Sequence, residues 1–378
     1  MTSEVTYMRM GDLIILQDKV NSDNCDYPVL GLNKDKNFMP TVANINDINL
    51  QKYKIVEKGW FAFSGMQTGR DVCIRIARYV DESPALISPA YTTFTIRDKV
   101  EETEISSAYV FLFFNREESD RYGAFISDSS VRANLDWARF CDIEIPVPDI
   151  EIQRQLVDVW EGLNGLKVDN DAQADPLMGL CMSYLKKLRE EYPLRKLGTG
   201  LIERVERYNT DGKLDIKSVR GISNTKEVIK TRANVTGRDF SSFLVLRHHE
   251  FVFNRRTTRN GERLGLGFNE GSEHFLFTND YVMFRVTNKE ELLPEYLYLC
   301  FKRDEFDRYV RWDSWGSATE FFNWENMLQV QIPVPPIEVQ QAIVDIYKCA
   351  KESKAISSEA EKLRKAVAPA LIQKAIHY

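Results

Sequence analysis

Histidine, cysteine and glycine-rich segments supply the chemistry of many active sites, and none of them forms a catalytic pattern in this chain. His248 and His249 are adjacent and His274 follows, but no cysteine or serine stands at a spacing that would make it a nucleophile beside them. The six cysteines lie 40 or more residues apart without a C-x-x-C pair, which favours reduced thiols in the core over a zinc or redox site. The segment "GLGFNEG" from Gly265 has the wrong final spacing for a dinucleotide-binding loop.

Motifs that bind nucleotides or activate water are also missing from the sequence. It contains no G-x-x-x-x-G-K-[ST] phosphate loop, no H-E-x-x-H zinc motif and no Asn/Asp-Pro-Pro-aromatic motif of amino-methyltransferases. Its longest apolar run, "AYVFLFF" from Ala108, is far shorter than a bilayer-spanning helix, and its N-terminus lacks the pattern of a signal peptide. We therefore expect a cytoplasmic protein with no membrane segment and no catalytic centre of its own.

The elements that must position any binding residues occur twice in the chain. Ten of 23 aligned positions are identical between residues 145–167, which begin "IPVPDIEIQ", and residues 332–354, which begin "IPVPPIEVQ". The same offset of 187 pairs Tyr109 with Tyr296, and further upstream the offset becomes 190. Self-similarity of this kind indicates tandem copies of one unit, and a chain of 378 residues is long enough for two or three domains.

Short runs of aromatic and β-branched residues indicate strands in both copies. These runs lie at residues 59–64, 90–96, 250–254 and 280–286. An aromatic segment with helical spacing follows in each copy, and in the second it begins at Pro294, a residue type suited to the first turn of a helix. Each globular part is therefore expected to be α+β.

A long helix is predicted after each repeated proline motif. The prolines keep the chain extended, and apolar residues then recur at alternating steps of four and three, as in the seam of a coiled coil. The predicted packing residues are Ile152, Leu156, Val159, Leu163, Leu166, Val339, Ile343, Ile346 and Ala350. We expect a break in the first helix near Pro176, because proline interrupts helices, and a shift of register in the second between Ser353 and Ser357.

The apolar face of each predicted helix must be buried away from water, and two arrangements of the helices would bury it. The helices, each ~60 Å long for ~40 residues, pack on each other in antiparallel fashion with a globular part at each end, or each helix packs on its own globular part. We favour the first. The predicted architecture is α+β, with globular domains at residues 1–148 and 192–335 and helical regions at residues 149–191 and 336–378.

The duplicated proline motif, which closes a β-rich unit and opens a long helix each time, resembles the specificity (S) subunits of Type I restriction-modification systems. The resemblance covers essentially the whole chain, from "RMGDLI" to "KLRKAVAPALIQKAIHY". It includes the Glu and Gln that follow each motif, namely Glu151, Gln153, Glu338 and Gln340. The first copy departs from the second in having Asp149 where the second has Pro336, and Gly162, Gly165 and Pro176 weaken its predicted helix.

In that family the globular parts are target-recognition domains, so the resemblance implies a non-catalytic subunit that reads DNA. The implied target is a bipartite, asymmetric site in double-stranded DNA, with one domain per half-site and the antiparallel helices fixing the unread spacer. The implied partners are two copies of a DNA adenine methyltransferase subunit and a restriction/translocase subunit. S-adenosylmethionine, ATP and Mg are expected on those partners, and no cofactor is expected in this chain.

The candidate DNA contacts are polar side chains on loops that match between the copies. Phosphates are bound by Lys, Arg and small polar groups, and base edges by Arg, Asn and Gln. Residues 204–263 form the most basic window, with 14 Lys and Arg against seven Asp and Glu. The candidates are Asn33, Lys34, Lys36, Ser64, Gln67, Thr68, Arg70, Arg220, Asn224, Lys226, Asn254, Arg255, Arg256, Arg259, Asn260 and Arg263. Solvated surface is the competing interpretation for each loop.

The charge balance argues against tight binding of DNA by the chain alone. Residues 1–144 carry 16 basic and 22 acidic side chains, and residues 192–331 carry 22 and 20. We expect weak, salt-sensitive binding by the isolated chain and tight binding in complex with its partners. The alternatives are a specificity subunit of a related modification-linked, Type IIB-like system, a two-lobed enzyme with a cleft between the lobes, and a scaffold that does not bind DNA.

Overall fold

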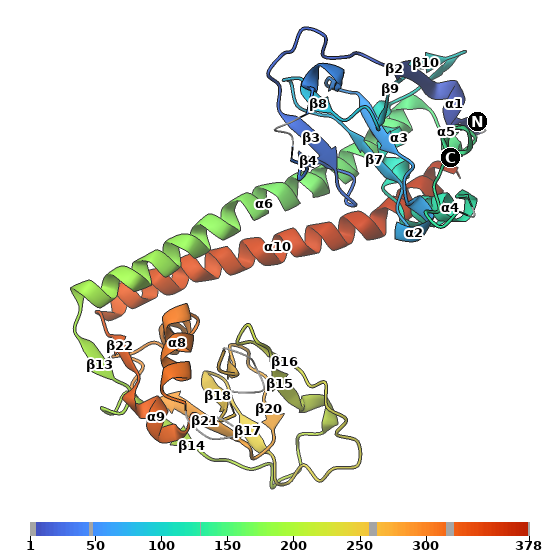
Figure 1. The fold of residues 1–378 in the computed structure, drawn as a ribbon. Helices are drawn as coiled ribbons and strands as arrows, with labels where there is room; N and C mark the ends of the chain where they lie inside the picture. The colour runs from blue at the N-terminus through green and yellow to red at the C-terminus, as the bar shows by residue number, and fades with distance from the viewer. Residues whose placement is uncertain (1–4, 45–47, 129, 257–262, 315–320, 377–378) are drawn as a thin grey trace. The chain divides into compact units, whose positions relative to one another are not determined.

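The computed structural model describes residues 5–44, 48–128, 130–256, 263–314 and 321–376. The chain divides into two compact units, which Figure 1 shows in ribbon form. Unit 1 is formed by residues 1–170 and 355–378, and unit 2 by residues 171–354. Two long helices, α6 (Ile150–Glu191) and α10 (Ile337–Ile376), each contribute one part of their length to each unit.

Unit 1 is built around a four-stranded antiparallel sheet with the order β2-β9-β6-β7. Its strands span, in that order, Ile14–Gln17, Thr92–Ile96, Phe61–Ser64 and Arg75–Arg78. Phe61 and Phe94 pair across neighbouring strands, and their rings stack with centroids 5.1 Å apart. These rings are buried beneath helix α3 (Ser107–Phe114), so the aromatic runs of the sequence form strands because they cover a helix-packed face.

A second sheet of unit 1 carries a β-hairpin. Its order is β4-β3-β8-β5, with strands Phe38–Pro40, Val29–Leu32, Ala85–Ile87 and Lys54–Val56. Strands β3 and β4 form the hairpin. The remaining elements are β1 (Thr6–Arg9) with β12 (Glu144–Val147), β10 (Lys99–Val100) with β11 (Thr103–Glu104), η1 (Leu50–Lys52), α1 (Met10–Leu13), α2 (Thr68–Asp71), α4 (Glu117–Ile126) and α5 (Trp137–Cys141).

Unit 2 repeats this plan. Its main sheet has the order β14-β21-β18-β19, with strands Ile202–Val205, Tyr281–Val286, Glu250–Asn254 and Leu266–Phe268. Phe251 and Phe284 pair as Phe61 and Phe94 do in unit 1, with ring centroids 4.8 Å apart. The remaining elements are β13 (Leu194–Lys196) with β22 (Gln331–Pro333), η2 (Ile216–Ser218), β15 (Arg220–Ile222) with β16 (Val228–Lys230), β17 (Leu244–Leu246) with β20 (Phe275–Phe277), α7 (Pro294–Phe301), α8 (Asp304–Trp312) and α9 (Trp324–Gln329). The predicted tandem α+β architecture is confirmed.

The repeated proline motif ends in a buried glutamine that ties each long helix to its domain. Gln153 is fully buried, and its Oε1 accepts the amide of Ser106 at 2.8 Å. Its Nε2 donates to the carbonyl oxygens of Glu104 and Pro148. Gln340 is buried in the same way and bonds the residues 187 positions later, namely Leu293, Glu291 and Pro335. Glutamine is required at these two positions because its amide satisfies three buried backbone groups at once.

The two long helices pack on each other within both units, as Figure 1 shows for each part. In unit 1 the first part of α6 shares a core with the last part of α10, through Leu156, Val157, Trp160, Ala368 and Ile372. In unit 2 the last part of α6 shares a core with the first part of α10, through Cys181, Leu185, Leu188, Ile343, Val344 and Tyr347. These pairings make the helices antiparallel, which confirms the predicted arrangement.

The residues that form the helix seam differ in part from the predicted set. Val159 and Leu166 are 49% and 51% exposed, whereas Val157 and Trp160 are buried. Near its start α6 must cover both α10 and the globular part of unit 1, so its buried face is wider than a coiled-coil seam and is rotated from the predicted stripe. Of the other predicted packing residues, Leu156, Ile343 and Ala350 are buried and Ile152, Leu163, Val339 and Ile346 are half-buried.

Two expected irregularities of the helices are corrected by the structure. Helix α6 continues through Pro176, which is exposed and so lies away from the packing face of the helix. Helix α10 keeps one register across Ser353 and Ser357, because both serines are themselves buried on the packing face. The register shift was expected only because the prediction counted apolar residues alone.

The cysteines occupy varied environments. All six are free thiols; Cys73, Cys181 and Cys300 are buried, but Cys349 is exposed on α10, contrary to the expected core position. Burial raises the pKa of Cys300 to about 12.

Within the described part of the chain, no helix has the length and apolar composition needed to cross a membrane.

Candidate functional site

In each unit a β-hairpin ends in a turn of the same construction, here called the hairpin segment: residues 33–37 in unit 1 and residues 223–227 in unit 2. The first residue of each turn, Asn33 or Ser223, accepts a hydrogen bond on its side-chain oxygen from the amide of the last, at 2.9 and 3.0 Å. The exposed candidates on these turns are Lys34 and Asn224. The two turns thus share a backbone frame but display different side chains.

Two other candidates on the hairpin segments point into the fold. Lys36 is 4% exposed, and its Nζ lies 2.6 Å from Oδ1 of Asp120 on α4. Lys226 is 3% exposed, and its Nζ lies 2.6 Å from both carboxylate oxygens of Asp307 on α8. Burial lowers the pKa of Lys226, and the hydrogen bond that its ammonium group donates to Asp307 opposes that shift. Both ammonium groups are therefore occupied within their own unit and are not presented at the surface.

The second candidate region of unit 1 is residues 64–70, here called the strand-end segment because it follows β6. Gln67 has a φ of 60°, and its amide donates to Oδ1 of Asn134 at 2.9 Å. Thr68 is fully buried, and its hydroxyl donates to the carbonyl oxygen of Gly65. Thr68 thus supports the turn, whereas Arg70 is exposed beside it.

The hairpin and the strand-end segment of unit 1 border one groove of about 480 Å³. Strands β3 and β4 form one part of its lining, and Ser64 and Gln67 form another. Arg75 and Tyr91, which the sequence interpretation did not select, also line it. The groove thus places Ser64 and Gln67 beside the strands of the hairpin, whereas the turn residues 33–37 and Arg70 are not part of its lining.

The strand-end segment of unit 2 comprises Asn254, Arg255, Arg256 and Arg263. Oδ1 of Asn254 accepts the amide of Arg256 at 3.0 Å, which orders the start of the turn. Arg255 is exposed, and its Nε donates to the carbonyl oxygen of Asp280 at 3.4 Å. Nη2 of Arg263 lies 4.0 Å from a carboxylate oxygen of Asp304. The candidates Arg259 and Asn260 lie outside the described residues.

Arg220 is held at the base of the unit 2 hairpin. Its guanidinium lies 4.5 Å from the ring centroid of Phe275 and donates to the carbonyl oxygen of Lys217 at 2.6 Å. These contacts leave Arg220 half-buried on β15, so it stiffens the hairpin more than it extends from it.

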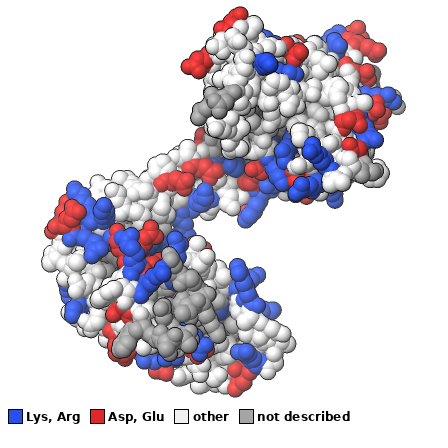
Figure 2. All heavy atoms as spheres, viewed as in Figure 1, with Lys and Arg blue, Asp and Glu red and all other residues white. Residues whose placement is uncertain are grey.

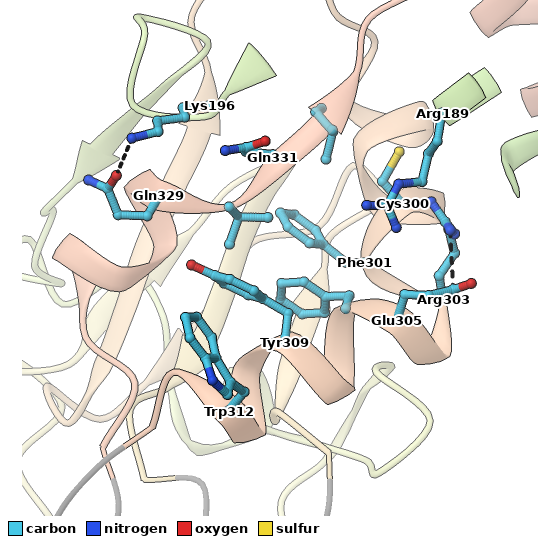
Figure 3. A pocket seen from close by; sticks show the side chains of 13 residues that line it. Arg189, Lys196, Cys300, Phe301, Arg303, Glu305, Tyr309, Trp312, Gln329 and Gln331 are labelled. Carbon is cyan, nitrogen blue, oxygen red and sulfur yellow. Dashed lines mark hydrogen bonds and ion pairs between the residues drawn. The ribbon is translucent and has the colours of Figure 1, made fainter. Parts of the chain in front are cut away.

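A separate pocket of about 440 Å³ opens in unit 2 beside helix α8 (Figure 3). Arg189 and Arg303 lie close together at one end, and Tyr309 and Trp312 lie at the other. Arg303 is mostly buried and sits 3.3 Å from Glu305. The repeat places Phe113 where this pocket has Cys300. Other lining residues do recur in unit 1 at the offset of 187, since Arg303, Glu305 and Tyr309 correspond to Arg116, Glu118 and Tyr122.

The adjacent histidines have a packing role. The rings of His248 and His249 stack with centroids 3.6 Å apart, and burial lowers the pKa of His249. Glu295 lies 3.4 Å from His249. Among the described residues, no group of three or more His, Cys, Asp or Glu side chains is placed to hold a metal ion.

The residues that sequence reasoning missed are Asp120 and Asp307. Each receives the buried lysine of its hairpin segment, and each also accepts a backbone amide beyond the strand-end segment, from Ile74 at 2.8 Å and Leu264 at 3.2 Å. A signal for them exists in the sequence. The two aspartates are related by the offset of 187 and the two lysines by the offset of 190.

Fold and site together define a class: a tandem α+β protein whose two repeats present loops of differing polar residues on a shared frame, joined by antiparallel helices. Residues 228–362 match the model of the Type I restriction modification DNA specificity domain. This match covers about a third of the chain. No curated protein sequence is detectably similar to the chain.

Solved structures extend the likeness to the whole chain. The S subunit of a Type I restriction-modification system from M. genitalium is similar over 98% of this chain and 96% of its own, with a TM-score of 0.60 and 11% identity. The HsdS subunit from Thermoanaerobacter tengcongensis matches over 99% and 97%, with a TM-score of 0.39 and 14% identity. A structure that describes complex assembly and conformational transition of the type I R-M system matches over 99% and 98%, with a TM-score of 0.43 and 12% identity. The resemblance to Type I specificity subunits, drawn from the sequence, is thus supported by the domain match over residues 228–362, and the chain shares its fold with the S subunit from M. genitalium.

Proposed function

We propose that this chain reads a bipartite, asymmetric site in double-stranded DNA, with one domain per half-site. The observation that carries the proposal is that the two units share their turn geometry and buried ion pairs but differ in the side chains at matching positions. The turn bonds and the buried Lys-Asp pairs recur, whereas the exposed Lys34 of unit 1 is replaced by Asn224 in unit 2, and the exposed Arg255 of unit 2 stands where unit 1 has Gly65. Because base edges are distinguished by side-chain identity, two domains with one frame and different displays suit two different half-sites.

In this proposal the chain contains no catalytic centre, and its partners perform the chemistry. Two copies of a DNA adenine methyltransferase subunit and a restriction/translocase subunit would dock on it in the cytoplasm. S-adenosylmethionine, ATP and Mg would be bound by those partners. An adenine must leave the base stack to be methylated, so the role of this chain is to select the site and hold the methyltransferases beside it.

The surface charge supports shared rather than solitary binding of DNA. Figure 2 shows basic and acidic side chains intermingled over the visible face of each unit. Affinity for the phosphate backbone depends on concentrated positive charge and is lost as salt rises. We therefore expect the isolated chain to bind DNA weakly, and the complex with methyltransferase subunits to bind its site tightly.

The antiparallel helices supply the spacing in this proposal. A continuous helix cannot shorten without breaking its hydrogen bonds, and α6 and α10 pack on each other in both units. Such a pair would fix the number of base pairs left unread between the half-sites.

The test is to express the chain with its proposed adenine methyltransferase subunit in a host that lacks other adenine methylation, and to map methylated adenines across the genome. We expect a single motif of two short, different sequences separated by unspecified bases. The control is the same methyltransferase expressed without this chain, which should leave the motif unmethylated. A continuous motif, or methylation that does not depend on this chain, would contradict the proposal.

A further inference from the structure

We propose that Asp120 in unit 1 and Asp307 in unit 2 are positioning residues that hold the two DNA-reading segments of their own domain in one fixed geometry. The inference rests on the proposed function, because it concerns how each domain presents its reading side chains. Neither aspartate is placed to contact DNA itself, since the side chains of both are largely buried.

In unit 2 a single carboxylate joins three elements. Asp307 belongs to helix α8, and both of its oxygens lie 2.6 Å from Nζ of Lys226, which comes from the hairpin segment. The same Oδ1 accepts the amide of Leu264, the residue directly after Arg263 of the strand-end segment. Helix α8 is thus bonded through one side chain to the hairpin segment and to the residue that follows the strand-end segment, so a shift of either would strain the bond to the other.

Unit 1 repeats the arrangement with the same partners. Asp120 on α4 receives Nζ of Lys36 at 2.6 Å and the amide of Ile74 at 2.8 Å on the same Oδ1. Nζ of Lys36 also donates to the carbonyl oxygen of Ile74 at 3.1 Å. Lys36, Ile74 and Asp120 are therefore each hydrogen-bonded to the other two. The hairpin segment and the chain that leaves the strand-end segment are therefore locked to one another.

Both buried lysines adopt an unfavourable backbone conformation. Lys36 and Lys226 have φ values of 60° and 65°, a region that a glycine at the same turn position would adopt without strain. Each also places an ammonium group in the interior, which is unfavourable unless the charge is paired. A strained, buried lysine that recurs in both repeats, while exposed neighbours diverge, points to a task common to both domains. Holding the reading surface rigid is such a task, because a site on rigid supports discriminates better than one on free loops.

Each aspartate is expected to affect the reading of one half-site only. If Asp307 no longer fixes the unit 2 segments, their side chains sample several positions and lose their preference among bases. Unit 1 keeps its own Lys36–Asp120 pair, so the other half-site should be read as in the wild-type complex. The converse holds for Asp120.

The experiment maps the methylated motif for the full complex containing Asp307→Asn or Asp120→Asn. We expect Asp307→Asn to lower base preference at least tenfold in one half of the motif and leave the other half unchanged. Asp120→Asn should do the same to the opposite half. The preference among bases is a ratio, so it does not change if a variant merely folds in smaller amounts.

Glu250→Gln is the matched control. Glu250 is 4% exposed and pairs with Arg207 at 3.2 Å, at the other end of strand β18 from the strand-end segment. Its loss should lower the amount of active complex without changing the motif. If Asp307→Asn proves too unstable to assay, the double variant Lys226→Met with Asp307→Leu replaces the ion pair by apolar side chains and removes the clamp.

Full base preference in both halves for the aspartate variants would overturn the inference, as would equal losses in both halves. A wild-type complex that yields no bipartite motif would instead contradict the proposed function, and the two failures are therefore distinguishable.

Discussion

At the scale of single residues, buried polar side chains hold the elements of each unit together. Gln153 and Gln340 each satisfy three backbone groups at the junction of a long helix with its domain. A buried backbone group left without a partner costs about 1–3 kcal/mol. The repeated sequence motif is thus explained by the junction that it builds.

We expect Gln340→Ala to lower the free energy of unfolding by about 2–4 kcal/mol, because it leaves one amide and two carbonyls of the junction unpaired. Gln341→Ala is the control, since Gln341 is exposed on the same helix and its side-chain amide donates to Asp345 on that helix. That change should stay within about 0.5 kcal/mol. Chemical denaturation followed by the fluorescence of the tryptophans measures both. Equal effects of the two substitutions would remove the special role of Gln340.

The residue scale is also where sequence reasoning was weakest. Lys36 and Lys226 were selected because lysines on polar turns usually reach solvent, but both are paired with an aspartate from a distant helix. No local pattern reveals such a pairing, since the partners are separated by 84 and 81 residues. Lys34 and Asn224, two residues earlier in the chain, are exposed as the turn geometry requires.

At the scale of elements, the sequence predicted the strands well and the helix seam less well. The runs around Phe61 and Phe251 read correctly as strands because their aromatic residues cover a packed face, where burial and strand formation favour the same residue types. The long helices were harder. Small residues such as Ser353 and Ser357 are polar, but they are buried on the packing face, where their size suits close packing of the helix.

A buried serine on the packing face of α10 gives the test of this corrected seam. We expect Ser357→Leu to destabilise the protein by about 1–3 kcal/mol, because the added volume overpacks a closely fitted surface. Ser358→Leu places the same side chain on the exposed side of the same helix and should change stability by about 0.5 kcal/mol or less. Thermal unfolding of the two variants side by side makes the comparison. A larger loss for Ser358→Leu would mean that the seam has been assigned to the wrong face.

At the scale of the whole molecule, the duplication itself is the central feature. The two units repeat a sheet order, an aromatic pair, a glutamine junction and a lysine clamp. The sequence disclosed this repeat because identical residues recur at constant offsets. It did not disclose which loop residues reach the surface, because that depends on contacts between segments far apart in the chain.

The most direct measurement of the central claim is the motif methylated by a chain that carries the first domain twice. In this variant residues 192–335 are replaced by residues 5–148, using the register that the repeat provides, and the complex is mapped as before. The account predicts a palindromic motif whose two halves both equal one half of the wild-type site, since each domain is proposed to read alone and the antiparallel helices reverse the chain direction of the second copy. A motif that keeps both different wild-type halves would contradict the assignment of one domain to each half-site.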